Sequence, residues 1–158
     1  MSKELTPEEL ITNEDTRKHI ATVSRVIHFV VKELLDRADR HDQSKLETPE
    51  VEEFAKHNHK LAGTTYGSKD SKDNREALKP ALDHHYAKND HHPEHFKHGV
   101  SDMDLVQLIE LFCDWKASSL RHHDGNLRKS IEVNAERYSL NPQLIRIFEN
   151  TAVLLDGV

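Results

Sequence analysis

Histidine is concentrated in one short stretch of this chain. The segment 83–99, DHHYAKNDHHPEHFKHG, contains six of the 13 histidines in a sequence of 158 residues. Histidine titrates near neutral pH and is the commonest protein ligand for transition metals. So many imidazoles in one segment therefore raise the question of whether the chain binds metal ions.

Further potential metal ligands lie in other parts of the chain. A His-Asp pair occurs in HDQSKLE, and an aspartate occurs in the apolar run LFCDWKA. A carboxylate buried in such a run is costly unless it is paired or bound to metal. The candidate ligands, in chain order, are His28, His41, Asp42, His85, His91, His92 and Asp114, with His19 as the alternative to His28.

This donor set has a definite chemistry. Neutral imidazoles together with carboxylates suit Mn²⁺, Fe²⁺ or Zn²⁺, with Mg²⁺ as a further candidate. Asp42 has two carboxylate oxygens and could bridge two ions. Two bridged ions would share a water and lower its pKa. We therefore expect two divalent ions per chain.

Helical periodicity runs along nearly the whole sequence and must position these residues. Thr6, Pro7 and Glu9 form the pattern of a capping box. The Gly- and Ser-containing segment 63–74 is typical of a loop, and we find no alternating strand pattern. The chain is expected to be all-α, with about six or seven helices at about 14–39, between Pro49 and Gly63, at 75–88, from Asp104 through LVQLIELFCDWKA, and at about 126–138 and 142–155.

Composition narrows the class of protein. A length of 158 residues suggests one domain, and the single cysteine, Cys113, fits a reducing compartment. The net charge of −6 argues against a long nucleic acid as partner. No apolar run reaches the length of a membrane span, and MSKELTPEEL lacks the pattern of a secretory signal. We expect a cytoplasmic protein with no membrane partner, and the oligomeric state stays open.

The order His…His-Asp…His…His…Asp on a helical chain resembles the HD-domain superfamily of metal-dependent phosphohydrolases. In that family the first His, the His-Asp pair and the final Asp bind one metal, and two intervening histidines bind a second. HDQSK also resembles a run in the HD-GYP phosphodiesterases, which implies that Lys45 contacts phosphate or a bridging water. More closely, HDQSKLE, HHYAKNDHH and CDWKA resemble an uncharacterised family of small bacterial and phage proteins, over about residues 25–125.

The resemblance implies a single HD-like domain over 1–158, with the motif core at about 25–125 and C-terminal helices at 126–155. It implies an enzyme, a nucleotidase or phosphodiesterase that hydrolyses a small phosphate ester, with a nucleotide as the expected substrate. Asp42 and Lys45 would be catalytic. Basic side chains would bind the phosphate, and the candidates are Lys45, Arg121, Lys129 and Arg137.

Two other function classes remain open on the same residues. Mixed-valent di-iron oxygenases use the same ligand order on a similar helical frame, and an iron-only requirement with loss of activity without oxygen would favour them. A non-catalytic metal-binding module is the other alternative. Metal binding without turnover of any phosphate ester would favour that interpretation.

Overall fold

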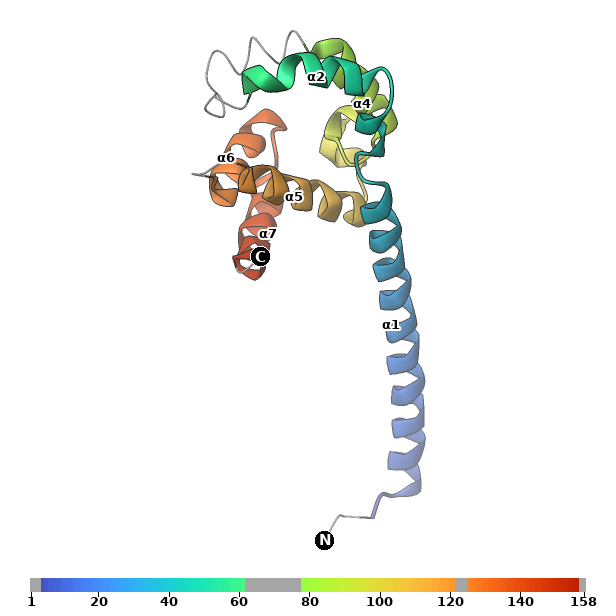
Figure 1. Ribbon diagram of the computed structural model, residues 1–158. Coiled ribbons are helices and arrows are strands. Elements are labelled where there is room, and N and C mark those ends of the chain that lie inside the picture. The colour runs from blue at the N-terminus through green and yellow to red at the C-terminus, as the bar shows by residue number, and fades with distance from the viewer. Residues whose placement is uncertain (1–3, 62–77, 122–124, 157–158) are drawn as a thin grey trace. The chain divides into compact units, whose positions relative to one another are not determined.

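The computed structural model describes residues 4–61, 78–121 and 125–156, and within them the chain is all-α (Figure 1). Short 3₁₀ turns lie between helices at Gln43–Leu46 (η1), Pro93–His95 (η2) and Gly99–Asp102 (η3), and a fourth follows the last helix at Val153–Leu155 (η4). The six α-helices of the described residues are α1 (Pro7–Arg40), α2 (Glu50–Leu61), α4 (Lys79–Lys88), α5 (Leu105–Leu120), α6 (Leu127–Arg137) and α7 (Pro142–Ala152). The predicted all-α class with about six helices is confirmed. The loop expected at 63–74 lies outside the described residues.

The chain divides into two compact units, Met1–Asp39 and Arg40–Val158. The first consists mainly of α1, which begins at Pro7, directly after the predicted Thr6 cap, and continues without a break through the segment expected to be helical at 14–39. Its start is the expected capping box: the Thr6 amide donates to Glu9 Oε2 at 2.8 Å, and the Glu9 amide donates to Thr6 Oγ1 at 3.2 Å. No residue of α1 is buried.

The second unit has its hydrophobic core among α5, α6 and α7. Phe148 of α7 stacks on Phe112 of α5 with ring centroids 5.0 Å apart, and it meets Trp115 edge-on at 5.3 Å. Each fully buried apolar side chain stabilises such a core by roughly 1.5–3 kcal/mol. The buried members are Leu111, Phe112, Trp115, Leu127, Ile131, Phe148 and Ala152. This packing fixes α5, the helix that carries Asp114.

Local hydrogen bonds set where these helices begin. Asp104 Oδ1 accepts from the amides of Val106 and Gln107 at 2.8 Å, and Gln107 Oε1 accepts from the Asp104 amide at 2.8 Å. Asn126 caps α6 by accepting from the amides of Arg128 and Lys129, and Asn141 caps α7 by accepting from the amide of Leu144. Gln107 also donates from Nε2 to Asp90 Oδ2 at 2.7 Å, which ties α5 to the histidine-rich segment.

None of the helices in the described parts of the chain is both long enough and apolar enough to cross a membrane.

Candidate metal centre

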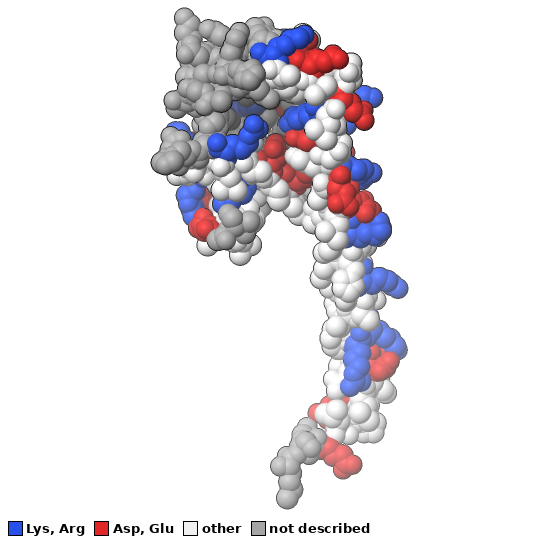
Figure 2. Space-filling view, viewed as in Figure 1, with Lys and Arg blue, Asp and Glu red and all other residues white. Residues whose placement is uncertain are grey.

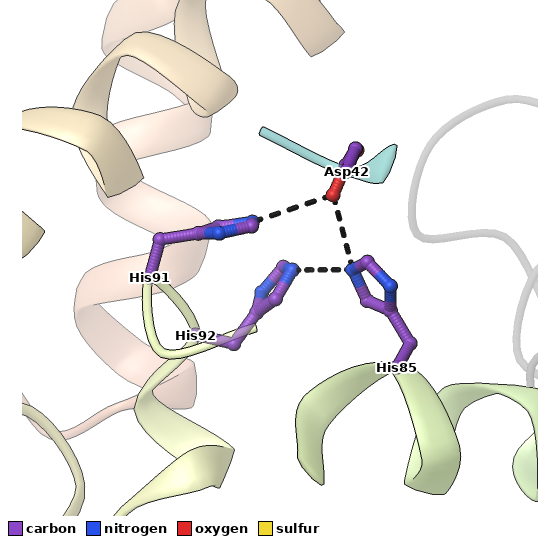
Figure 3. Close-up of side chains that lie close together, drawn as sticks. All are labelled: Asp42, His85, His91 and His92. Atoms are coloured by element: carbon purple, nitrogen blue, oxygen red, sulfur yellow. Dashed lines mark hydrogen bonds and ion pairs between the residues drawn. The ribbon is translucent and has the colours of Figure 1, made fainter. Parts of the chain in front are cut away.

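Three histidines converge on Asp42 in the second unit (Figure 3). Asp42 lies between α1 and η1, His85 lies on α4, and His91 and His92 lie in the turn between α4 and η2. Asp42 Oδ1 is 3.2 Å from His85 Nε2 and 3.5 Å from His91 Nε2, and His85 Nε2 is 2.9 Å from His92 Nε2. One ligand atom from each of the four residues lies within 4.8 Å of the others. We call these four residues the Asp42–His92 cluster.

Two atoms of this cluster are buried without a hydrogen-bond partner: Asp42 Oδ1 and His91 Nε2. Although their separation is 3.5 Å, no hydrogen bond joins them. A buried polar atom left unpaired costs about 1–3 kcal/mol. A cation placed among these atoms would satisfy both, because a carboxylate oxygen and an imidazole lone pair are metal donors. The residues present therefore fit a divalent transition metal ion.

Glu50, the first residue of α2, fixes the orientation of His85. Its side chain is completely buried, and Oε2 accepts from His85 Nδ1 at 2.8 Å while Oε1 accepts from His84 Nδ1 at 2.7 Å. Ser44 Oγ also donates to Oε2, at 3.1 Å. With Nδ1 donating to Glu50, the Nε2 lone pair of His85 faces Asp42, as in metal sites where a carboxylate orients a ligating histidine.

Glu110 on α5 makes the equivalent contacts with two other histidines. Its Oε1 lies 2.8 Å from His41 Nδ1 and 3.2 Å from His91 Nδ1. This carboxylate therefore turns the Nε2 atoms of both rings toward Asp42. His41, His91 and Glu110 also form a possible ligand group on distance alone, but these Nδ1 contacts are better explained as orienting hydrogen bonds.

A second group of potential ligands consists of His41, Asp42 and Asp114. His41 Nε2 lies 3.4 Å from Asp42 Oδ2 and 3.9 Å from Asp114 Oδ1. The structure thus places Asp114, the predicted ligand on α5, beside His41. Asp42 thus presents Oδ1 to the three histidines of the Asp42–His92 cluster and Oδ2 to this second group.

Lys45 holds the second oxygen of Asp42. Its Nζ donates to Asp42 Oδ2 at 2.6 Å, and its backbone amide donates to the Asp42 carbonyl at 2.9 Å. Asp42 itself has a φ of 57°, in the left-handed region that non-glycine residues seldom adopt. Such backbone conformations persist where the surrounding contacts over-determine them, and they cluster at functional sites.

The electrostatics of the site keep Asp42 ionised. Burial acts to raise the pKa of Asp42, but the neighbouring side chains of His41, His85 and Lys45 outweigh it and hold the pKa well below its usual range. Hydrogen bonds to Asp42 and Glu110 raise the pKa of His41 to about 10. Burial lowers the pKa of His92 to about 2, with neighbouring His91 and His85 acting in the same direction. His92 is therefore a neutral imidazole, the form that binds metal.

The structure thus brings six of the seven predicted ligands into two adjoining groups. His28 lies on α1 with an exposed side chain, as does His19, and neither belongs to the groups found among the described residues. The two orienting glutamates, Glu50 and Glu110, are not among the residues predicted from the sequence. A signal for Glu110 existed, because it precedes Asp114 by four residues and so lies on the same face of α5.

The basic residues predicted to bind substrate are spread over the second unit. Lys45 lies at Asp42, as described above. Arg137 pairs with Glu94, and its Nη2 lies 3.4 Å from the Tyr86 hydroxyl. Lys129 pairs with Glu132 at 3.0 Å on the exposed face of α6, and Arg121 is exposed at the C-terminal end of α5. The phosphate-binding role of these side chains stays a prediction.

The fold and these contacts define the chain as an all-α protein with a candidate metal centre built from histidines and aspartates. A model of DUF5662, a family of unknown function, matches residues 8–154. The chain therefore belongs to that family. Neither the curated proteins nor the solved structures contain a match to this chain.

Proposed function

We propose that this protein is a metal-dependent phosphohydrolase that uses two divalent ions, of Mn, Fe or Zn, to hydrolyse a phosphate ester. The observation that carries the proposal is the Asp42–His92 cluster, in which Asp42 Oδ1 and His91 Nε2 are buried without a hydrogen-bond partner. The likeness of the ligand order to HD-domain enzymes supports the reaction class. The choice of a nucleotide as substrate rests on that likeness alone.

Each residue has a distinct part in the proposed reaction. When bound, the ions would lower the pKa of a water and neutralise charge on the phosphate ester. Asp42 would hold both ion positions through its two oxygens, and Glu50 and Glu110 keep the imidazoles aimed at those positions. The Lys45 ammonium, 2.6 Å from Asp42 Oδ2, offers a cation for a phosphate oxygen beside the reacting centre.

The two proposed ion positions should differ in affinity. The Asp42–His92 cluster offers three imidazoles and one carboxylate oxygen. The second group offers two carboxylates and one imidazole, His41, which must lose a proton before it can bind an ion. Lys45 already occupies one of the carboxylate oxygens. An ion in the second group must share Asp42 Oδ2 with an ammonium, so we expect the cluster to fill first.

Metal analysis tests the binding part of this proposal. We expect about two ions per chain after supplementation, and one retained when excess metal is dialysed away. Mass spectrometry of the elements in purified protein gives both values. Less than about half an ion per chain after supplementation would contradict any metal centre here.

Asp42→Ala tests the catalytic part. Because Asp42 contributes to both ion positions, hydrolysis should fall by about 10³-fold or more. The exposed Asp83 on α4 pairs with Lys79 at 2.9 Å, so Asp83→Ala is the matched control and should keep parent activity. A panel of phosphate monoesters and diesters with added Mn²⁺ supplies the rate, and thermal unfolding shows whether both variants fold.

The results separate the function classes. Near-parent hydrolysis by Asp42→Ala would overturn the proposal. A parent protein that binds metal but releases no phosphate from any ester in the panel would instead support a non-catalytic metal-binding module.

A further inference from the structure

Helix α1 presents apolar side chains that nothing in its own unit covers. It runs for 34 residues, which corresponds to about 51 Å. None of its residues is buried, and Ile20, Val23, Ile27 and Val30 are between 37% and 59% exposed. Helices of this kind derive most of their stability from packing an apolar face against a partner. A partner for α1 is therefore expected.

The apolar positions follow a heptad repeat. Ile20, Val23, Ile27, Val30 and Leu34 are spaced by three, four, three and four residues, the a and d pattern of a coiled-coil seam. On the opposite face, Lys18, Arg25 and Lys32 recur at every seventh residue. Figure 2 shows the charged side chains gathered along one side of α1 over most of its length. The seam is therefore a stripe on one face of the helix.

We propose that α1 pairs with α1 of a second copy of this chain in an antiparallel two-stranded coiled coil. A heptad seam is complementary to itself, which favours a second copy over an unrelated partner. Charge favours the antiparallel direction. Residues 7–23 contain four acidic and two basic side chains, a net charge of −2, whereas residues 24–40 contain four basic and three acidic, a net charge of +1.

Antiparallel pairing sets these halves of opposite charge side by side, and it also aligns the two helix dipoles favourably. A parallel pair would bring like halves together. It would also place Val rather than Leu at the d positions, and Leu at d is the choice that favours parallel dimers.

The repeat also sets a register. In an antiparallel seam each a position faces a d position of the other helix. Val23 then packs against Ile27 of the partner subunit, and Ile20 packs against Val30 of the partner subunit. Thr16 lies opposite Leu34 of the partner subunit in the same register.

The mass of the full chain in solution is the first test. Light scattering after size-exclusion chromatography should give the parent protein a mass of about twice 18.2 kDa. The Ile27→Glu variant should have the mass of the monomer, because the substitution puts a charge in the seam. The matched control is Phe29→Glu. Phe29 lies on the face of α1 away from the seam and is 64% exposed, against 55% for Ile27. This variant should stay dimeric. Fluorescence of Trp115, buried in the second unit, shows that the rest of each variant is folded.

A monomeric parent chain would overturn the proposal, since α1 would then be covered within its own chain or by another partner. Dissociation by Phe29→Glu as well as by Ile27→Glu would overturn the assignment of the seam.

Cross-linking tests the direction of the helices. In a Cys113→Ser background, Thr16→Cys alone should form no disulfide dimer, because two such positions lie about 27 Å apart in the antiparallel register. Thr16→Cys combined with Leu34→Cys should form disulfide dimers on oxidation. Dimers formed by Thr16→Cys alone would show a parallel pair and overturn the antiparallel arrangement.

Discussion

Replacing Glu50 with glutamine tests how the protein aims His85 at the candidate metal centre. Glu50 has no exposed surface, and its carboxylate accepts hydrogen bonds from the Nδ1 atoms of His84 and His85 and from Ser44. Glutamine keeps the volume and one acceptor oxygen but removes the charge. Glu50→Ala is less informative, because removing one partner of such a buried network costs about 3–5 kcal/mol and threatens the fold.

The magnitude follows from the hydrogen bonds that lose their charge. A hydrogen bond to a charged group contributes about 1.5–3 kcal/mol, and one between neutral groups about 0.5–1.5 kcal/mol. Each of the two imidazole contacts should therefore weaken by about 1 kcal/mol, so the metal-free protein loses roughly 2 kcal/mol of stability. Loss of a carboxylate that orients a ligating histidine typically lowers metal affinity by about 10- to 100-fold.

Competition with a chelator of known affinity measures Zn²⁺ binding, and urea unfolding of the metal-free protein measures stability. Glu52→Gln is the matched control, since Glu52 lies in the same turn of α2 but is exposed and contacts only Thr48 among the hydrogen bonds described. We expect Glu52→Gln to bind Zn²⁺ with the same affinity as the parent protein. If Glu50→Gln binds Zn²⁺ as tightly as Glu52→Gln does, Glu50 does not orient a metal ligand and the reasoning fails.

Two further changes test the neighbourhood of Asp42 and the core. Lys45→Ala should lower phosphate release by roughly 10- to 100-fold while the more tightly held ion stays bound, whereas an equal loss of metal would mark Lys45 as structural. Lys56→Ala, an exposed lysine paired with Glu53, is its control. Ile131→Ala should lower the free energy of unfolding by roughly 2–5 kcal/mol, because Ile131 is fully buried. A urea unfolding midpoint unchanged from that of the parent protein would contradict the place of Ile131 in the hydrophobic core.

Helix starts were predictable from the sequence because they depend on near neighbours. Thr6 with Glu9, and Asp104 with Gln107, form capping boxes within a few residues. The histidines of the candidate metal centre were equally visible, since histidine is rare enough for six in one segment to be noticed.

Glu50 could not be found in this way. A glutamate directly after Thr48-Pro49 is what any helix start favours, because acidic side chains interact well with the helix dipole there. Its role comes from the approach of α4, which brings His84 and His85 to it from 34 and 35 residues away in the chain. Such tertiary contacts leave no periodic trace in the sequence.

Asp42 has one property that the sequence predicts and one that only the structure shows. The sequence predicts that it could bridge two ions, but it does not predict the left-handed backbone, φ 57°, that Asp42 adopts between α1 and η1. Glycine would adopt this conformation more easily, so the backbone alone does not account for an aspartate here. The side chain does: it presents Oδ1 to His85 and His91 and Oδ2 to Lys45 and His41. The strained backbone at this position therefore coincides with a carboxylate placed between the two ligand groups, as is common at functional sites.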